Sequence, residues 1–340
     1  MVNDAELLTA FLAGRPRALA QAISRAEAGE GAALMHALFP RTGRALTIGL
    51  TGPPGVGKST LCGALVKIAR QEGRTVGVVS VDPSSPFSHG AILGDRIRLT
   101  EHFTDPGVFI RSMASRGHLG GLAGATGDAV ALMDAFGQDV VIIETVGVGQ
   151  SEIEIAELAD TTLVALQPGS GDSVQLLKAG ILEVADVFVV NKADHPMALQ
   201  LQREIRGMLE MLDFSGWVPE LVATQAREGV GIEKLWAAIG SHRAYLRESG
   251  DLAAKRRSAF AHRVRALVLG DLERRVEAQI AALLDDPAGP PPDPYHAAEL
   301  LLGRLAGALP PVLPLARQNR ALAHSSVKGL YRDSETHHDH

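Results

Sequence analysis

Seven short apolar runs, rich in β-branched residues, constrain the fold of this chain more than any other feature. A turn and then a stretch with helical spacing of apolar positions follow these runs along the chain. The runs lie at residues 45–52, 75–82, 108–114, 139–147, 161–169, 186–194 and 220–226. Continuous apolar strands that alternate with helices are typical of a parallel sheet covered on both faces. We therefore predict an α/β fold with a doubly wound, mostly parallel sheet.

Helical segments flank this sheet domain on both sides. Residues 4–39 have apolar positions at helical spacing, interrupted at Gly14 and Pro16. Leu252–Leu284 has the pattern of one long helix with an apolar stripe, and a short helix is expected near Tyr295–Leu309. The predicted divisions are a helical N-terminal extension (1–43), the sheet domain (44–245), a helical arm (246–309) and a weakly ordered tail (310–340). Five prolines within residues 286–294 predict a break in the arm.

Composition excludes several classes of protein. The net charge of -6 argues against a general nucleic-acid binder, which needs a basic face. A single cysteine, Cys62, allows no internal disulfide, and its position predicts a packed helix residue rather than a reactive thiol. No run approaches the roughly 18 apolar residues of a membrane-spanning helix. The first twenty residues carry early acidic residues and no secretory signal pattern, so we expect a cytoplasmic protein.

A phosphate-binding loop is predicted directly after the first apolar run. The sequence GPPGVGKS fits the pattern G-x-x-x-x-G-K-[ST] between an expected strand and an expected helix. The residues expected to bind nucleotide here are Gly52, Pro53, Pro54, Gly55, Val56, Gly57, Lys58, Ser59 and Thr60. Backbone N–H groups in such a loop bind the β-phosphate, the lysine bridges the β- and γ-phosphates, and the hydroxyl binds Mg²⁺. A glycine-rich turn without ligand is the alternative.

A second motif predicts that the base is guanine. Asn191, Lys192 and Asp194 lie at the end of the sixth apolar run, and the Asp194 carboxylate can accept hydrogen bonds from the N1–H and exocyclic amine of guanine. Lys192 can lay its aliphatic stem along the base, and Asn191 can tie this loop to the phosphate loop. Backbone amides of Gln225, Ala226 and Arg227 are expected near the guanine oxygen. The alternative is a solvated turn rich in Asn and Asp.

Three carboxylates are candidates for the magnesium site and for sensing the γ-phosphate. Asp82 and Glu144 each follow an apolar run, which places them at the carboxyl edge of the sheet where nucleotides bind. Asp95 is a further candidate, with an exposed helix acid as its alternative. With Ser59 they form the expected magnesium set, and Glu144 could also orient the attacking water. For Glu144 the alternative is a helix cap.

Two glycine-rich segments are predicted to be mobile switches beside the γ-phosphate. One is Arg111–Gly127, and the other is Gln167–Asp172, which precedes a helix bearing Lys178. Arg111, Arg116 and Lys178 are candidates for a positive charge that stabilises the transition state. For each of them a solvated surface position is the alternative.

With these motifs assembled, the chain resembles the MeaB/ArgK-type GTPases, the group that includes the human methylmalonic aciduria type A protein, within the SIMIBI class of P-loop proteins. The resemblance covers roughly residues 40–245 and rests on blocks that most GTPases lack. These blocks are VVSVDPSSPFSHGAILGDRIRL, FIRSMASRGHLGGLA, VIIETVGVGQSE and LQPGSGDSVQLLKAGILEVAD, beside TGPPGVGKST and NKAD.

The resemblance implies a homodimeric chaperone that binds GTP/GDP and Mg²⁺ and serves an adenosylcobalamin-dependent acyl-CoA mutase. Such a protein gates cofactor delivery, with a cobalamin adenosyltransferase as a further partner, and protects or reactivates the mutase. It implies that Lys58, Asp82, Glu144 and Lys178 act in hydrolysis and that the segment around Asp172 and Lys178 is an additional switch. The long helix from Leu252 resembles the family's dimerisation arm.

Some residues depart from the pattern of this family. Phe87 and His89 stand where a more polar run is expected, and Gln225 stands where a serine is usual. Two other functions stay open: a small-molecule kinase of the arginine/ornithine type, and a nickel-delivery GTPase. The kinase needs an acceptor pocket, and nickel delivery predicts a Cys/His cluster near the nucleotide. The sequence does not identify the mutase.

Overall fold

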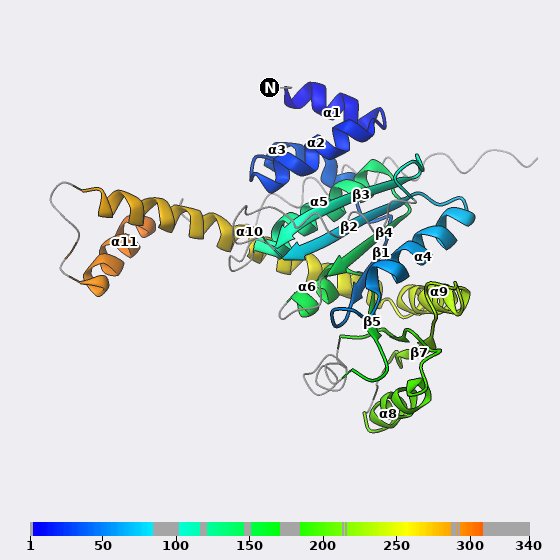
Figure 1. Cartoon of the computed structure of the whole chain (residues 1–340). Helices are drawn as coiled ribbons and strands as arrows, with labels where there is room; N and C mark the ends of the chain where they lie inside the picture. Colours follow the sequence, from blue (N-terminus) through cyan, green and yellow to red (C-terminus); the bar gives the residue numbers. More distant parts are fainter. Residues whose placement is uncertain are drawn as a thin grey trace, which may run out of the picture. The chain divides into compact units, whose positions relative to one another are not determined.

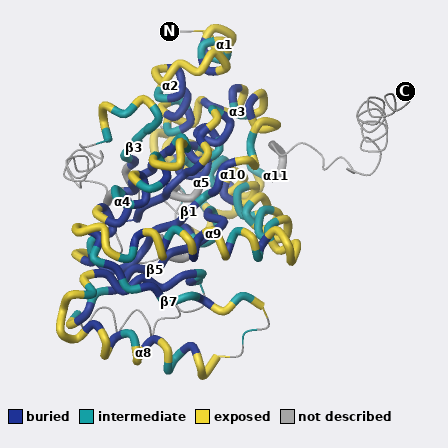
Figure 2. Tube along the Cα trace, turned by 90° about the vertical axis from the view of Figure 1, so that its right-hand side faces the viewer, coloured by how far each residue is buried: buried dark blue, intermediate teal, exposed yellow. Residues whose placement is uncertain are grey.

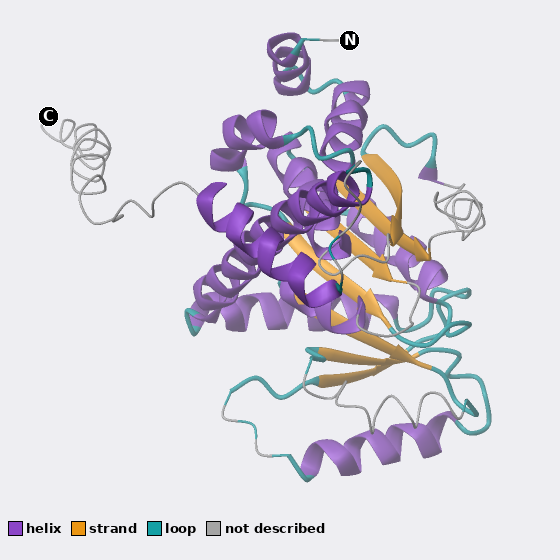
Figure 3. Cartoon of the chain, turned by 90° about the vertical axis from the view of Figure 1, so that its left-hand side faces the viewer, coloured by secondary structure: helices purple, strands orange, loops and turns teal. Residues whose placement is uncertain are grey.

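A single parallel sheet is the centre of the fold, as the apolar runs predict. The structure is a computed structural model and describes residues 3–83, 102–115, 121–145, 151–170, 184–212, 214, 216–286, 291 and 293–308. Within this part, seven strands pair in the order β3-β2-β4-β1-β5-β6-β7, and every pairing is parallel (Figure 1, Figure 3). The strands are β1 Leu46–Thr51, β2 Val76–Pro83, β3 Val108–Ser115, β4 Val140–Thr145, β5 Thr161–Leu166, β6 Val187–Val190 and β7 Glu220–Ala223. All seven predicted runs are therefore confirmed as strands.

Helices cover both faces of the sheet, which is why the strands are apolar on both sides. One face packs against α4 Lys58–Gln71 and α9 Ile232–Glu248. On the other face, α5 Gly121–Phe136 lies over β2, β3 and β4, and α6 Ser151–Leu158 lies beside α5. The N-terminal helices cover this face as well: α1 Asp4–Leu12, α2 Pro16–Glu27, α3 Ala32–Leu38 and η1 Phe39–Arg41. The β5 and β6 half of that face packs against α8 Ala198–Glu210, which alternates between buried and exposed residues along its length (Figure 2).

The N-terminal helices form where their spacing predicts. Gly14 has a left-handed φ of 71° between α1 and α2, and Pro16 is the first residue of α2, where its missing N–H costs nothing. Leu19 and Ile23 of α2 are fully buried. Phe11 packs edge-on against Phe136 of α5, with ring centroids 5.2 Å apart. These helices therefore share one core with the sheet.

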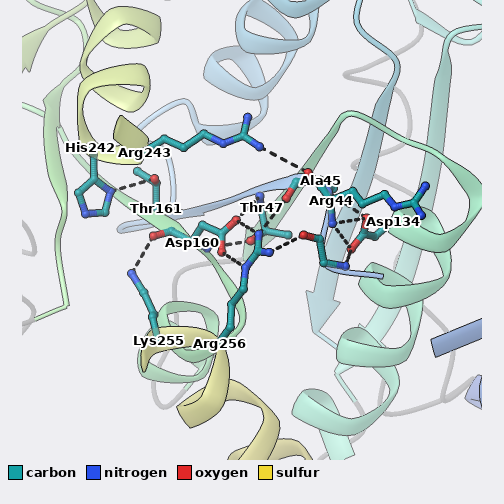
Figure 4. A network of polar contacts seen from close by, with 11 residues as sticks. Arg44, Ala45, Thr47, Asp134, Asp160, Thr161, His242, Arg243, Lys255 and Arg256 are labelled. Atoms are coloured by element: carbon teal, nitrogen blue, oxygen red, sulfur yellow. Dashed lines mark hydrogen bonds and ion pairs between the residues drawn. The ribbon is translucent and has the colours of Figure 1, made fainter. Parts of the chain in front are cut away.

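The long helix α10 Asp251–Leu284 is attached at its start to the amino edge of the sheet (Figure 4). Arg256 donates to both carboxylate oxygens of Asp160, at 3.0 and 3.2 Å, and to the backbone oxygens of Gly43 and Ala45. Lys255 donates to the Asp160 backbone oxygen at 2.9 Å and to the Asp186 carboxylate at 3.0 Å. Since Asp160 precedes β5 and Asp186 precedes β6, two cations of α10 cover the beginnings of two strands.

A second pair of contacts joins α10 to the helices that cover the sheet. Arg263 donates to the Gly127 backbone oxygen at 2.6 Å and forms an ion pair with Asp128, both on α5. Burial lowers the pKa of Arg263 to about 10, so the guanidinium stays charged at neutral pH. His262 contacts Glu157 at the end of α6. The first part of α10 is therefore held by α5 and α6 as well as by the sheet.

Removing the Asp160 carboxylate is expected to destabilise the fold. This side chain is almost fully buried, and it accepts hydrogen bonds from Arg256 and from the Thr47 amide. Asp160→Ala should lower the free energy of unfolding by about 1–3 kcal/mol, because the partly exposed Arg256 guanidinium and a backbone N–H lose their buried partner. Urea denaturation measures the change. Glu210→Ala, at an exposed position ending α8, is the control and should shift stability by less than about 0.5 kcal/mol. Equal effects of the two changes would contradict this role for Asp160.

The proline-rich segment ends α10, as the sequence predicts. Helix α10 stops at Leu284 and α11 Pro294–Ala308 follows. The Asp293 side chain accepts hydrogen bonds from the Tyr295 and His296 amides, at 2.8 and 3.0 Å, and so caps α11. The chain divides into two compact units, Met1–Asp271 and Leu272–His340, and the division falls within α10. Among the described residues, every helix is too short or too polar to cross a lipid bilayer.

Candidate nucleotide-binding site

The phosphate loop joins β1 to α4 and requires glycine at two tightly packed positions. Gly52 has φ 139°, and a Cβ there would overlap the backbone oxygen of Ala165 on β5. Gly57, the residue before α4, has φ 95°, and a Cβ there would come within 2.6 Å of the Asn191 side-chain amide. An L side chain is strained at such φ values and would also collide with these neighbours. The loop therefore curls closely over β5 and beside Asn191.

Lys58 and Ser59 begin α4, and both side chains are buried. The Lys58 ammonium donates to the backbone oxygens of Gly52 and Pro53, at 2.7 and 2.9 Å. These bonds fold the lysine back over its own loop. The N-terminus of α4 adds a favourable dipole for an anion at this point. The arrangement suits a phosphate group.

Glu144 meets the start of α4 from the carboxyl end of β4. The Ser59 hydroxyl donates to Oε1 of Glu144 at 2.6 Å, and the Glu144 side chain is 6% exposed. The neighbouring Thr145 hydroxyl donates to the Thr51 hydroxyl at 3.1 Å, which joins β4 to β1. A buried hydroxyl–carboxylate pair beside a lysine offers the hard oxygen ligands that Mg²⁺ prefers. The residues present therefore fit a magnesium ion.

Asn191 connects the guanine motif to the phosphate loop, as the sequence predicts. Its side-chain amide donates to the Val56 backbone oxygen at 2.8 Å, and its side-chain oxygen accepts from the Thr224 hydroxyl and the Ala226 amide, each at 3.1 Å. A buried asparagine side chain is stable only when its amide and its oxygen are hydrogen-bonded. Through these three bonds Asn191 links its own loop to the phosphate loop and to the loop after β7. Asp194 lies in the exposed turn that follows, with its carboxylate available to solvent.

The sequence predicts backbone amides of residues 225–227 near the guanine oxygen, but the amides of Gln225 and Ala226 have other partners. The Ala226 amide donates to Asn191, and the Gln225 amide donates to the Val230 backbone oxygen at 2.9 Å. These two amides stabilise the loop itself rather than point at a base. Arg227 lies on the exposed side of the same turn.

Several predicted residues lie partly or wholly outside the described part of the chain. Asp82 is the penultimate residue of β2, which pairs with the strand that carries Glu144, but the structure describes only its backbone. Asp95, Asp172 and Lys178 lie outside the described residues. Their roles stay predictions.

The prediction of a mobile loop over Arg111–Gly127 is wrong for most of its length. Arg111 lies within β3, and helix α5 begins at Gly121. The Arg111 guanidinium forms an ion pair with Glu27 and donates to Ser24 at 3.1 Å, both on α2. It therefore attaches the N-terminal helices to an outer strand and is engaged away from the phosphate loop. Arg116 lies outside the described residues.

Cys62 is fully buried one turn after Ser59. Burial raises the pKa of its thiol well above the ordinary value, and the nearby Glu144 charge adds to this. The thiol is therefore protonated and inaccessible, and the prediction of a packed helix residue is confirmed. Among the described residues, no group of three or more His, Cys, Asp or Glu side chains could hold a metal ion.

A polar cluster at the opposite edge of the sheet gave no recognisable sequence signal. His242 of α9 is buried, with Nδ1 2.9 Å from the Thr161 hydroxyl and Nε2 3.3 Å from the Asp186 carboxylate. Burial lowers the pKa of His242, because desolvation outweighs the attraction of Asp186. It borders an open pocket of about 380 Å³ that Trp217 and Lys255 also line. A single histidine within a helix does not reveal in the sequence that it is buried, because its partners Thr161 and Asp186 lie far away along the chain.

Known proteins resemble this chain over nearly all of its described length. A family model described as "Methylmalonyl Co-A mutase-associated GTPase MeaB" matches residues 16–281. A Pyrococcus horikoshii protein, named as a candidate GTPase, is 45% identical over 317 residues, which cover 89% of this chain and 98% of that protein. GTPase ArgK of Escherichia coli K12 is 37% identical over 266 residues, 74% of this chain and 80% of ArgK.

Two further relatives extend the comparison. The mitochondrial methylmalonic aciduria type A homolog of Mus musculus is 39% identical over 223 residues, 64% of this chain and 54% of the mouse protein. A crystal structure titled LAO/AO transport system kinase superposes with a TM-score of 0.65 at 27% identity, covering 90% of this chain and 99% of that one. The family model alone spans more than half of the chain, over the same residues that form the phosphate loop and the guanine motif. The chain belongs to the MeaB family of methylmalonyl Co-A mutase-associated GTPases.

Proposed function

We propose that this protein hydrolyses GTP in a magnesium-dependent reaction and acts as a chaperone of an adenosylcobalamin-dependent acyl-CoA mutase. The proposal of GTP hydrolysis rests on one observation: the phosphate loop, the guanine motif and Glu144 meet at the carboxyl edge of the sheet. The Asn191 side chain donates to the phosphate loop at Val56, and Ser59 at the end of the same loop donates to Glu144, so the candidate phosphate, metal and base residues meet at one edge of the sheet. The family description supports the mutase part.

The residues of this edge divide the work of binding and hydrolysis. Backbone N–H groups of residues 55–60 and the Lys58 ammonium hold the phosphates, while Asp194 selects guanine. Ser59 and Glu144 would hold Mg²⁺, with Asp82 and Asp95 as further ligands, and the ion supplies positive charge at the phosphate oxygens. Glu144 is also the residue proposed to orient the attacking water, and Lys178 is the proposed additional charge. The slow intrinsic rate of unassisted GTPases, about 10⁻⁴ to 10⁻² per second, leaves room for acceleration by a partner.

A homodimer is part of this proposal. Large apolar side chains on α10 are exposed in the single chain: Phe260, Val264, Leu267, Val268 and Leu269 are each 43–55% exposed. A stripe of this kind on one helix is stabilised when a second apolar surface covers it. A second copy of α10 would supply that surface, as in the dimerisation arm of the related GTPases.

The test is GTP hydrolysis by the purified chain with and without an acyl-CoA mutase from the same source. We expect the mutase to accelerate hydrolysis at least about tenfold, with a cobalamin adenosyltransferase added in a separate arm. If no such mutase changes the rate or the nucleotide affinity, the chaperone proposal is wrong while the GTPase proposal stands. Transfer of the γ-phosphate to arginine or ornithine, rather than to water, would instead support a small-molecule kinase.

A further inference from the structure

Lys192 joins the guanine motif to two other segments through the end of its side chain. Its ammonium donates to the Gly55 backbone oxygen of the phosphate loop at 2.8 Å and to Oε1 of Gln167 at 2.6 Å. Among the described residues, Lys192 is also the single non-glycine residue with a left-handed backbone, at φ 56°. Such a conformation costs free energy for a long side chain and persists where surrounding contacts fix it. The side chain is thus held at its backbone and at its tip.

Gln167 lies where the chain after β5 meets the phosphate loop and the guanine motif. It follows β5 directly, and β5 passes so close to the phosphate loop that Gly52 has no room for a Cβ beside Ala165. Two residues later, the open side of Gly169 faces His195 and Met197, which follow the guanine motif. The beginning of the segment after β5 is therefore packed between the phosphate loop and the guanine motif.

We propose that Gln167 is a positioning residue that sets the affinity for guanine nucleotides by holding Lys192 along the base. This inference rests on the proposed function, because it assumes that a guanine nucleotide binds at this edge. When Gln167 withdraws, the ammonium keeps the Gly55 oxygen but loses a second fixed acceptor, and the stem is less restricted. Nucleotide affinity then depends on the conformation of the chain after β5. By linkage, nucleotide binding favours the conformation in which Gln167 reaches Lys192.

The test compares Gln167→Met with Gln167→Glu in the full chain. Methionine has similar length but no oxygen acceptor, whereas glutamate retains the acceptor. Fluorescent GDP and GTP analogues measure Kd and the dissociation rate. We expect Gln167→Met to raise both Kd values about 5- to 10-fold, mostly through faster dissociation, with KM rising by a similar factor and kcat changing by less than about twofold. The Gln167→Glu variant, which keeps an oxygen acceptor at this position, should have Kd values within about twofold of the unmodified protein.

A double-mutant cycle separates this role from a general loss of packing. In a Lys192→Met background, Gln167→Met should weaken binding no further, because the ammonium that it positions is absent. Gln200→Met, on an exposed part of α8, is the matched control and should leave both Kd values unchanged. An unchanged Kd in Gln167→Met, or an equal further loss in the Lys192→Met background, overturns the inference. Failure of the unmodified chain to bind either analogue would instead overturn the proposed function.

Discussion

Replacing Asp194 with asparagine is expected to weaken GTP binding about 100-fold and to create affinity for xanthosine triphosphate. The carboxylate accepts two charge-assisted hydrogen bonds from guanine, and asparagine offers one acceptor and a misplaced donor. Each lost bond to a charged group is worth about 1.5–3 kcal/mol, which corresponds to a factor of about 100 or more for the pair. Xanthine has an oxygen where guanine has its exocyclic amine, so the asparagine amide can donate to it.

Competition between the three nucleotides measures this change in specificity. GTP, xanthosine triphosphate and ATP are compared as competitors of a fluorescent guanine nucleotide on both proteins. Glu228→Gln changes an exposed carboxylate in the neighbouring turn and should leave the GTP Kd within about twofold. If Asp194→Asn loses GTP affinity without any gain for xanthosine triphosphate, the base does not contact Asp194 in the proposed way.

The second large effect is expected from Lys58→Met, which should slow GTP hydrolysis roughly 10²- to 10³-fold. Methionine fills a similar volume but removes the buried ammonium of the phosphate loop, so charge developing on the phosphates loses a preorganised partner. Single-turnover hydrolysis of radiolabelled GTP at saturating protein measures the effect on chemistry apart from binding. Circular dichroism verifies that the variant is folded.

Lys67→Met is a matched control on the same helix, because Lys67 lies on the exposed side of α4. It removes the same charge from the same element and should leave the hydrolysis rate within about twofold. A normal rate in Lys58→Met would mean that this lysine only satisfies the Gly52 and Pro53 oxygens, which it contacts at 2.7 and 2.9 Å.

Features that depend on local pattern were predictable from the sequence. The seven strands, the N-terminal helices and α10 follow from periodicity, because burial on two faces or on one stripe dictates which positions are apolar. The meeting of Gly57 with Asn191 was predictable as well, since the carboxyl ends of parallel strands lie at one edge. Strand order and the pairing of β1 with both β4 and β5 depend on long-range packing that the local pattern does not encode.

Side chains whose partners lie far along the chain were not predictable. Arg111 contacts Glu27, 84 positions away, so its apolar run predicted the strand but nothing local predicted a partner on α2. The sequence predicts Gln167 only as the start of a candidate switch segment. Its contact with Lys192 joins positions that are 25 residues apart, so no local pattern indicates it. Asp160 and Asp186 look like ordinary polar residues before apolar runs. Their ion pairs follow from where α10 returns to the sheet.

That return of α10 has a consequence for how such a protein can be varied. The helix begins with two cations, Lys255 and Arg256, that match carboxylates belonging to the sheet. A chain shortened before α10 would leave Asp160 and Asp186 without these partners, whereas one that ends after Asp271 would retain them. The base of the arm therefore belongs to the same hydrogen-bonded unit as the sheet, whereas the part beyond Asp271 belongs to the second compact unit. Exchanging whole arms between relatives should succeed only when the exchange begins beyond that base.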